Sequence, residues 1–199
     1  HRIFEGKSHG FYVDVGAHHP RRFSNTYFFY KRGWRGINIE PNPDASNLFR
    51  SARSRDINIQ LGVSDSTGRI TYYQYDEPAA NTFDSKIVNS RLAMARYKLQ
   101  STSEVNVERL DHILTNHLPA GTQIDFLSID VEGLDFAVLK SNDWERYRPK
   151  CVLVEALGSS LEDVMDSAMF DFMKRHHYRL FAKTYNTLIF LNASHNAQA

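Results

Sequence analysis

The sequence is short of cysteine and of long apolar runs. Its single cysteine, Cys151, excludes an intramolecular disulfide and a cysteine-rich zinc site. Because Cys151 lies in an apolar run, we expect it to be a buried structural thiol. No stretch of about 18 apolar residues occurs, so no membrane-spanning helix is expected. No secretory signal peptide is recognisable at the start of the chain. These absences favour a cytoplasmic protein.

The chain also lacks an excess of either charge. Lys and Arg total 24, while Asp and Glu total 23. This near-balance argues against a nucleic-acid partner, for which a strongly basic face is expected. Basic residues gather locally at 21–22, 31–35 and 50–55. These groups are either solvated surface or part of a mouth that attracts an anionic substrate.

Segments typical of strands and of helices alternate along the chain, whose length fits a single domain over residues 1–199. Strands are predicted at 11–15, 36–40, 57–63, 69–75, 105–110, 124–129, 151–154, 178–183 and 187–191. Helices are predicted at 24–32, 44–53, 85–99, 111–118, 134–140 and 160–176, with Ser24 or Asn25 capping the first and Asp44 the second. This order predicts an α/β fold with a Rossmann-like, mostly parallel sheet, an antiparallel C-terminal strand and helices on both faces.

Residues 76–103 interrupt the alternation of strands and helices. This insertion is either a lid over a site or a surface elaboration. Asn81, Thr82 and Phe83 within it are candidate contacts to a substrate. The tail at 193–199 is expected to be flexible.

A glycine turn, V-D-V-G-A-H-H-P at residues 13–20, follows the first predicted strand. Ligands of α/β sheets bind at the carboxyl ends of strands, and Gly16 allows the backbone to approach a ligand closely. The dinucleotide fingerprint G-x-G-x-x-G is absent, which argues against a nicotinamide cofactor. Pro20 argues against a helix that begins directly after Gly16. A plain strand-to-loop turn is the alternative interpretation.

Acidic residues end three further predicted strands. Glu40 ends the second strand, where an acid can accept two hydrogen bonds from a ribose diol. Asp130 and Glu132 follow the strand at 124–129, and either can act as a general base or cap the next helix. Glu155 ends the next strand, and together with Asp130 it could hold Mg²⁺. We expect no metal, because oxygen ligands alone are a weak indication.

Four segments together resemble the FkbM family of methyltransferases. They are V-D-V-G-A at 13–17, S-N-T at 24–26, G-W-R-G-I-N-I-E-P-N-P at 33–43 and I-D-F-L-S-I-D-V-E-G at 124–133. The resemblance covers about residues 10–192. It implies a class I methyltransferase fold, S-adenosylmethionine as methyl donor and mostly O-methylation. The acceptors that it implies are hydroxyl groups on sugars, glycolipids and macrolides.

The resemblance also implies roles for individual residues. The residues that it places at the donor are Asp14, Gly16, Ala17, Thr26, Glu40, Pro41, Asn42, Ser64, Asp65 and Asp130. It places Asp130 and Glu132 as the active-site pair. His18 is a further catalytic candidate because of its position in the loop after the first strand, and not because of the resemblance. Where many family members have Asn and then Gly after Gly-Ala, this chain has His18-His19-Pro20.

The expected partner is a small-molecule or glycan acceptor with a free hydroxyl group. Two other functions stay open from the sequence. One is a nicotinamide-dependent oxidoreductase on a similar sheet, which the missing glycines disfavour. The other is a binding domain that keeps the fold without turnover, which the retained acids disfavour. The sequence pattern indicates no oligomeric state.

Overall fold

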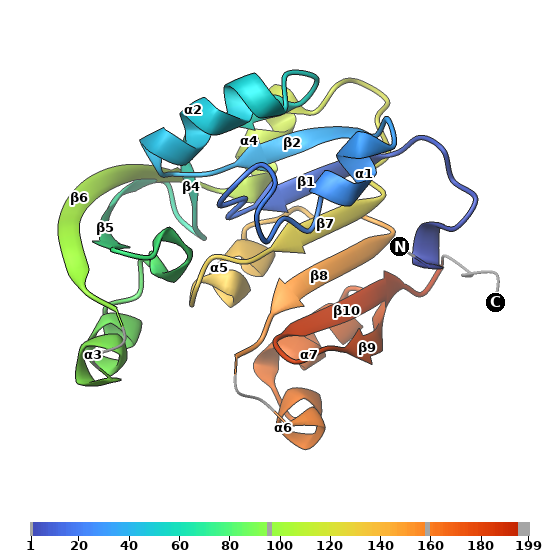
Figure 1. Cartoon of the computed structure of the whole chain (residues 1–199). Coiled ribbons are helices and arrows are strands. Elements are labelled where there is room, and N and C mark those ends of the chain that lie inside the picture. The colour runs from blue at the N-terminus through green and yellow to red at the C-terminus, as the bar shows by residue number, and fades with distance from the viewer. Residues whose placement is uncertain (1, 95–96, 158–159, 195–199) are drawn as a thin grey trace.

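The computed structural model describes residues 2–94, 97–157 and 160–194, which form a seven-stranded main sheet and a smaller three-stranded sheet (Figure 1). The main sheet has the order β3 (Ile57–Ile59), β2 (Arg35–Ile39), β1 (Phe11–Val15), β7 (Phe126–Ile129), β8 (Cys151–Glu155), β10 (Thr187–Asn192) and β9 (Tyr178–Lys183). The first five strands are parallel, and β10 runs antiparallel to β8 and β9. The predicted α/β fold with a mostly parallel sheet is therefore confirmed.

Apolar side chains cover both faces of the main sheet, as is usual for parallel strands. Alternate residues of β1 serve two cores, because Val13 and Val15 join one face and Tyr12 joins the other. Helices α4 (Leu110–His117), α5 (Asp135–Lys140), α6 (Leu161–Met165) and α7 (Ala168–Arg175) contribute to the first core. The second core includes η1 (Arg2–Phe4), α1 (Tyr27–Lys31) and Cys151, which is fully buried as predicted. Helix α2 (Pro43–Ala52) contacts β3.

The small sheet has the order β4 (Gly62–Val63), β6 (Leu99–Glu108) and β5 (Gly68–Tyr75). Strands β5 and β6 form a long antiparallel hairpin, and η2 (Pro78–Ala80) and α3 (Ser85–Met94) lie in the segment that connects them. In Figure 1 the arrowheads of β1, β7 and β8 point toward the side on which this unit projects. The predicted insertion thus faces the edge of the sheet at which ligands bind.

Several predicted boundaries are wrong because strand pairing at long range decides them. The predicted strand 57–63 is two strands, β3 and β4, which belong to different sheets. Of the predicted helix 85–99, the described part is helical over Ser85–Met94, residues 95–96 lie outside the described residues, and Leu99 belongs to a strand. Strand β6 begins at Leu99 instead of residue 105, because it pairs along the whole length of β5. The last residues of the predicted insertion are therefore part of a strand.

Local capping explains the other differences. The predicted helix 160–176 is two helices, since the Ser167 hydroxyl accepts a hydrogen bond from a main-chain N–H and begins α7. Thr26 directly precedes α1 but makes no side-chain capping bond, whereas the predicted Ser24 hydroxyl accepts from the N–H of Tyr27, the first residue of the helix, at 3.1 Å. Asn42 replaces the predicted Asp44 as the cap of α2.

The helices of the described ranges are too short or too polar to cross a bilayer. Residues 195–199, most of the tail predicted to be flexible, lie outside the described residues.

Candidate active site

A cavity of about 250 Å³ lies at the carboxyl ends of β1 and β7. The strand order of the main sheet reverses between these two strands, and α/β sheets bind ligands in the crevice at such a reversal. Loops after β1, β2 and β7 line the cavity on one side, and β5 and the insertion line it on the other. The predicted residues that line it are Asp14, Gly16, Ala17, His18, Glu40, Pro41, Asn81, Phe83, Asp130 and Glu132.

Gly16 adopts a left-handed backbone conformation, with φ +74°, directly after β1. A β-carbon at this position would overlap the main-chain carbonyl oxygen of Asp130. The N–H of Gly16 also donates to the carbonyl of Ile39 at 3.0 Å. Glycine is therefore required because it brings the loops after β1, β2 and β7 together, a reason beyond the close ligand approach that the sequence indicates.

Glu40 presents a carboxylate that the main chain holds in place. One of its oxygens accepts from the N–H of His18 at 2.8 Å, and the other accepts from the N–H of Asn42 at 2.9 Å. The residue is 6% exposed, and burial raises the pKa of Glu40 to about 7 despite these two hydrogen bonds. Each oxygen keeps a further acceptor position, so the carboxylate can bind two hydroxyl groups.

Asp14 is the last residue but one of β1, and its carboxylate is held in place by Thr26. The Thr26 hydroxyl, which is fully buried, donates to Asp14 at 2.7 Å. Burial raises the pKa of Asp14 to about 6, and hydrogen bonds from Thr26 and Ser128 and the charge of Arg53 oppose this rise. Thr26 does not line the cavity but orients a carboxylate that does.

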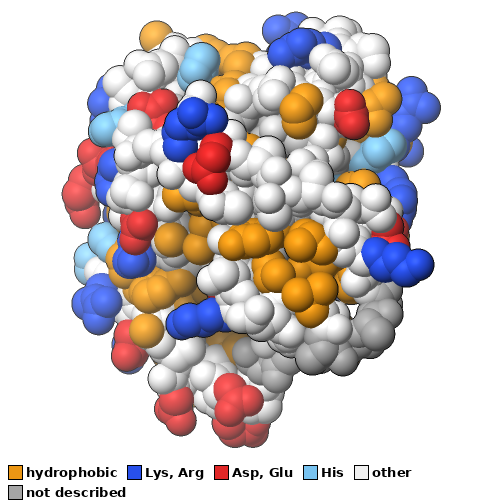
Figure 2. Space-filling model, turned by 90° about the vertical axis from the view of Figure 1, so that its left-hand side faces the viewer, with side chains coloured by type: hydrophobic (Ala, Val, Ile, Leu, Met, Phe, Trp, Pro, Cys, Tyr) orange, Lys and Arg blue, Asp and Glu red, His pale blue; other side chains and the backbone are white. Residues whose placement is uncertain are grey.

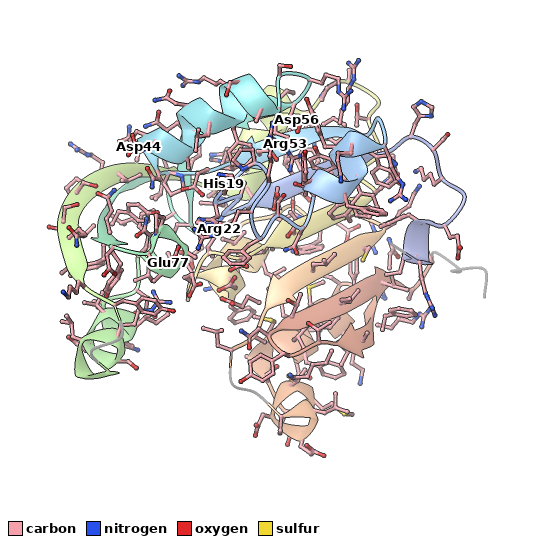
Figure 3. All side chains as sticks on the ribbon, viewed as in Figure 1. His19, Arg22, Asp44, Arg53, Asp56 and Glu77 are labelled. Carbon is pink, nitrogen blue, oxygen red and sulfur yellow. The ribbon has the colours of Figure 1, made fainter. Side chains whose placement is uncertain are left out.

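Arg53 is fully buried, although the sequence places it in a basic segment that we interpreted as surface or mouth. Its guanidinium donates to the carbonyl of Pro20 at 2.8 Å, the Tyr12 hydroxyl at 2.9 Å and the Ser24 hydroxyl at 2.9 Å. It also pairs with Asp56 at 3.5 Å, and Figure 3 shows the two residues side by side. Arg53 thus fixes the loop that connects β1 to α1.

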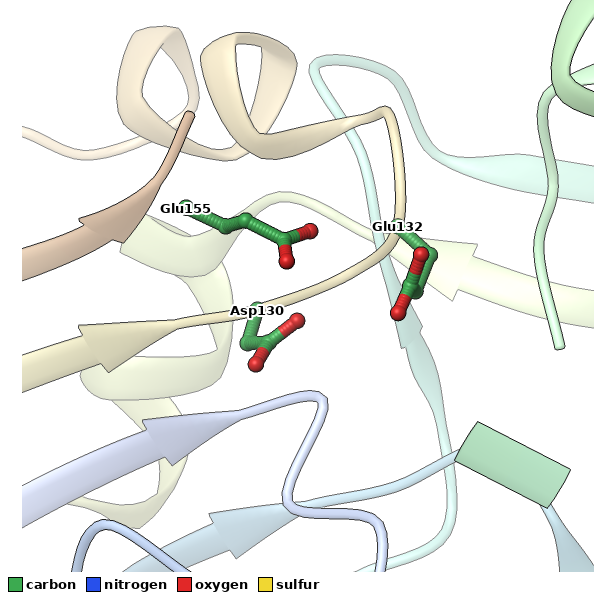
Figure 4. Close-up of side chains that lie close together, drawn as sticks. All are labelled: Asp130, Glu132 and Glu155. Carbon is green, nitrogen blue, oxygen red and sulfur yellow. The ribbon is translucent and has the colours of Figure 1, made fainter. Parts of the chain in front are cut away.

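Three carboxylates gather beside the cavity, and we call Asp130, Glu132 and Glu155 the carboxylate cluster (Figure 4). One oxygen of each lies within 4.8 Å of the others. Asp130 is open to the cavity, yet the surrounding protein, and then the nearby charges of Asp135 and Glu132, raise its pKa to about 7. Burial and the charge of Asp130 raise the pKa of Glu155 to about 9. These two groups therefore hold a proton more readily than ordinary carboxyls.

Glu132 differs from the other two members because it has a cationic partner. It forms an ion pair with Arg91 of α3. Its backbone is left-handed, with φ +53°, and its carbonyl accepts from the Thr82 hydroxyl at 2.6 Å. Asp130 and Glu132 do not cap α5, which has Leu134 at its cap position. Of the two interpretations left open by the sequence, capping is thus wrong.

His18 lies in the loop after β1 with φ +55°, stacked against Phe23 at 6.3 Å between ring centroids. Its Nε2 atom is buried and has no hydrogen-bond partner among the described residues. Burial and then the charge of Arg22 lower the pKa of His18. A neutral imidazole with an unpaired nitrogen can accept a proton.

Four residues that the resemblance places at the donor do not line the cavity. They are Thr26, Asn42, Ser64 and Asp65. Asn42 acts through its main-chain N–H on Glu40. Asp65 instead pairs with Lys140 at 2.8 Å. Gly62 and Val63 of β4, which come directly before Ser64 and Asp65, do line the cavity.

The sequence gives no signal for several residues that line the cavity. Tyr72 of β5 is buried, and its burial, followed by the charge of Glu40, raises the pKa of its phenol. Its ring packs against Phe83 at 4.7 Å between centroids. Phe23 is 75% exposed with a left-handed φ of +56°, which is unusual for a large apolar residue.

A charged pair lies next to Phe23 and Ala79, two residues that line the cavity. Arg22 pairs with Glu77 of the insertion at 2.6 Å, and Figure 3 shows both residues near His19. Arg22, which belongs to a basic group interpreted as either solvated surface or mouth, is thus paired with an acid. The side on which the insertion projects carries apolar side chains in its middle and charged side chains around them (Figure 2).

The fold and the site together define a class of protein. A mostly parallel sheet, a glycine turn after β1 and an acid held by main-chain amides after β2 are typical of nucleotide-binding α/β proteins.

Comparison with protein families makes the assignment more specific. The family model described as the methyltransferase FkbM domain matches residues 14–180. Because this match spans most of the chain, the chain belongs to the FkbM methyltransferase family. Membership confirms the resemblance stated from the sequence and favours a methyltransferase over the nicotinamide-dependent alternative.

A solved structure supports the fold. The chain is similar to methyltransferase FkbM from Methylobacillus flagellatus KT, with a TM-score of 0.53 and 16% sequence identity. The match covers 92% of this chain and 44% of the other, so this chain spans less than half the length of that protein. At this identity the likeness concerns the fold alone. Comparison with curated proteins finds no match.

Proposed function

We propose that the chain binds S-adenosylmethionine in the cavity and methylates a hydroxyl group of a small-molecule or glycan acceptor. Glu40 is the observation that carries this proposal. Each of its carboxylate oxygens accepts one main-chain N–H and keeps room for one more donor. This arrangement suits the two neighbouring hydroxyls of a ribose.

Other lining residues fit the rest of such a donor. Pro41, Leu61 and Val63 supply apolar contacts beside Glu40, where a purine ring would be held. Asp14 and Asp130 place carboxylates at the ends of β1 and β7, where a positively charged group is favoured. When bound, S-adenosylmethionine supplies a methyl group that its positively charged sulfur already activates.

The acceptor hydroxyl must lose a proton, and we assign this step to Asp130 and Glu155. Two carboxylates this close resist double ionisation, so the pair keeps one proton near neutral pH. The ionised oxygen of the pair can then accept the hydroxyl proton. His18, with its unpaired Nε2, is the next candidate for the base.

The charge of the site favours an acceptor that is not an anion. Asp14 and Asp130 line the cavity, and an oxygen of Glu155 lies within 4.8 Å of one of Asp130, so a phosphate group placed there would be repelled. We therefore expect an uncharged hydroxyl-bearing acceptor and no nucleic acid. The exposed ring of Phe23 offers this acceptor an apolar surface at the mouth.

We also propose that methyl transfer is independent of a metal ion. The cluster offers three carboxylates to a divalent cation, but Arg91 already neutralises Glu132. A chelator should leave turnover unchanged. Loss of activity that Mg²⁺ restores would instead assign Asp130, Glu132 and Glu155 to a metal site.

Calorimetry with the purified protein tests the donor directly. Titration with S-adenosylhomocysteine should give a dissociation constant on the order of micromolar, whereas NAD should not bind comparably, because the glycines of a dinucleotide site are missing. Tight binding of NAD without binding of S-adenosylhomocysteine would overturn the proposal. Binding of S-adenosylhomocysteine without methyl transfer to any hydroxyl acceptor would instead support the alternative of a binding domain without turnover.

A further inference from the structure

The insertion is joined to the site by two ion pairs that differ in what they contact. Arg22 and Glu77 join it to the loop after β1, and neither belongs to the carboxylate cluster. Arg91 and Glu132 join it to the loop after β7. The second pair therefore brings a cation of the insertion into the cluster.

Arg91 is held firmly for this contact. Its guanidinium donates to Glu132 and also to the main-chain carbonyl of Ala80 in η2. The Arg91 side chain is 13% exposed and that of Glu132 is 21% exposed, so solvent screens the pair less than it would a surface pair. The Arg91 guanidinium is thus fixed by Ala80 within the insertion and by Glu132 on the loop after β7.

The Glu132 loop is shaped to meet this cation. The Thr82 hydroxyl donates to the Glu132 carbonyl, and the left-handed φ of Glu132 costs backbone energy. The next residue, Gly133, has φ +113° and packs so closely against Ile87 of α3 that a β-carbon would clash with it. Contacts with the insertion therefore stabilise a conformation that Glu132 would not adopt alone.

We propose that Arg91 is a positioning residue, which pairs with Glu132 and so leaves Asp130 and Glu155 as the two carboxylates that share a proton. In Figure 4 the carboxylates of Asp130 and Glu155 face each other, while Glu132 lies apart on its loop. Arg91 neutralises the third charge of the cluster. The insertion thereby controls the acid–base chemistry of the site as well as covering it.

Arg91 is the cation among the charged groups that act on this pair within the described residues. The others are Asp14 at the end of β1, Glu132 on the loop after β7 and Asp135 at the start of α5, all of which raise the pKa values of one or both members. Arg91 lowers the pKa of Glu155. Removal of its charge should therefore increase the proton affinity of the pair.

The test is a titration of the Asp and Glu side-chain carboxyls by carbon-13 NMR, with Asp130→Asn and Glu155→Gln used to assign the signals. Arg91→Gln should raise the lower apparent pKa of the pair by about 1 unit, because Glu132 is left as an uncompensated anion. Glu132→Gln should lower it by a similar amount. The double variant, in which both charges are absent, should return close to the wild-type value.

Arg22→Gln is the matched control, because it removes the other ion pair between the insertion and the site without touching the cluster. It should leave both apparent pKa values of the pair unchanged, and Arg91→Lys should restore most of the wild-type titration. If Arg22→Gln and Arg91→Gln have equal effects, or if Arg91→Gln and Glu132→Gln shift nothing, Arg91 merely attaches the insertion and the proposal is wrong.

The opposite shifts expected of Arg91→Gln and Glu132→Gln keep the test informative if one variant does not fold. The proposal rests on Asp130 and Glu155 as the base of the proposed function. The titration, however, needs neither donor nor acceptor. Failure to bind S-adenosylhomocysteine would therefore overturn the proposed function and leave the result on Arg91 readable.

Discussion

An aspartate lies at each end of strand β7, and the two have opposite surroundings and opposite shifts in pKa. At the amino end, Asp125 accepts hydrogen bonds from Lys7, from Lys150 at 2.8 Å and from the N–H of Phe11 at 3.0 Å. These partners outweigh its burial and lower the pKa of Asp125. At the carboxyl end, Asp130 has acids as neighbours, and its pKa is raised to about 7.

We interpret this difference as one between a charge that stabilises the fold and a charge that we propose for catalysis. Folding alone favours the arrangement of Asp125, because a buried charge that is paired costs little. Nothing in folding favours the arrangement at Asp130 and Glu155, where burial and like charges both disfavour ionisation. Groups with strongly perturbed pKa values beside a cavity are typical of active sites.

The largest expected effect is on the free energy of unfolding, when a glycine at the carboxyl edge of the sheet and one at the amino edge are each replaced by alanine. Gly16→Ala should lower the free energy of unfolding by about 3 kcal/mol or more, because its methyl group meets the Asp130 carbonyl at a positive φ. Gly33→Ala, also at a positive φ but with open space around it, should cost about 1–2 kcal/mol. Urea denaturation measures both, and equal costs would mean that the loops can separate freely.

The second comparison substitutes the two aspartates themselves. Asp130→Asn should reduce turnover of a verified acceptor by about 100-fold or more while the fold and donor binding persist. Asp125→Asn should lower the free energy of unfolding by about 1.5–3 kcal/mol, because it weakens hydrogen bonds to charged groups. Initial-rate assays and urea denaturation of both variants measure the turnover and the free energy of unfolding of each.

The pH dependence gives a further check on Asp125. Its pKa is lower in the folded protein, so its stabilisation is present above the unfolded pKa and disappears as pH falls through the folded pKa. The stability difference between wild type and Asp125→Asn should therefore shrink as the pH falls below the unfolded pKa of about 3.9 and continue to shrink through the lower folded pKa. For the substitutions of the previous paragraph, wild-type turnover by Asp130→Asn would contradict the assignment of a catalytic role to the aspartate at the carboxyl end of β7.

The smallest expected effect is the change in stability on substitution of Glu155. Its charge should destabilise the fold, whereas the charge of Asp125 should stabilise it. The pKa of Glu155 is raised to about 9 in the folded protein, so the folded state binds more protons than the unfolded state between about pH 4.5 and 9. Its cost to stability is absent at pH 4 and grows as pH rises. Glu155→Gln should raise the Tm by about 2–4 °C at pH 8 and leave it unchanged at pH 4. A lower Tm at pH 8 would show that the charge of Glu155 is stabilised.

The sequence predicts those parts of the site that depend on short segments. Gly16, Glu40 and Asp130 each follow a short segment in which apolar residues predominate or alternate with polar ones, so their place at the carboxyl edge follows from the strand itself. Parallel strands align these ends without further information. The mostly parallel α/β character of the main sheet is predictable from the alternation of strands and helices along the chain.

Contacts between residues that are far apart in the sequence cannot be predicted from such short segments. Arg91 meets Glu132 and Arg53 meets Pro20 because of how the insertion and α2 pack, and neighbouring residues do not reveal this. Arg53 lies between Ala52 and Ser54 in a segment that has the pattern of a solvated surface. The extent of β6 depends likewise on its partner β5.

Glu40 gives the most direct test of the central claim, that the carboxyl edge of the sheet holds a methyl donor through an acid kept ready by main-chain amides. Calorimetric titration of S-adenosylhomocysteine should show binding to Glu40→Ala weakened about tenfold to a hundredfold or more, since hydrogen bonds to a charged acceptor contribute about 1.5–3 kcal/mol. Glu40→Gln, which keeps one acceptor oxygen, should lose less, and the thermal stability of both variants should change far less than their affinity. An unchanged dissociation constant for Glu40→Ala would contradict the account.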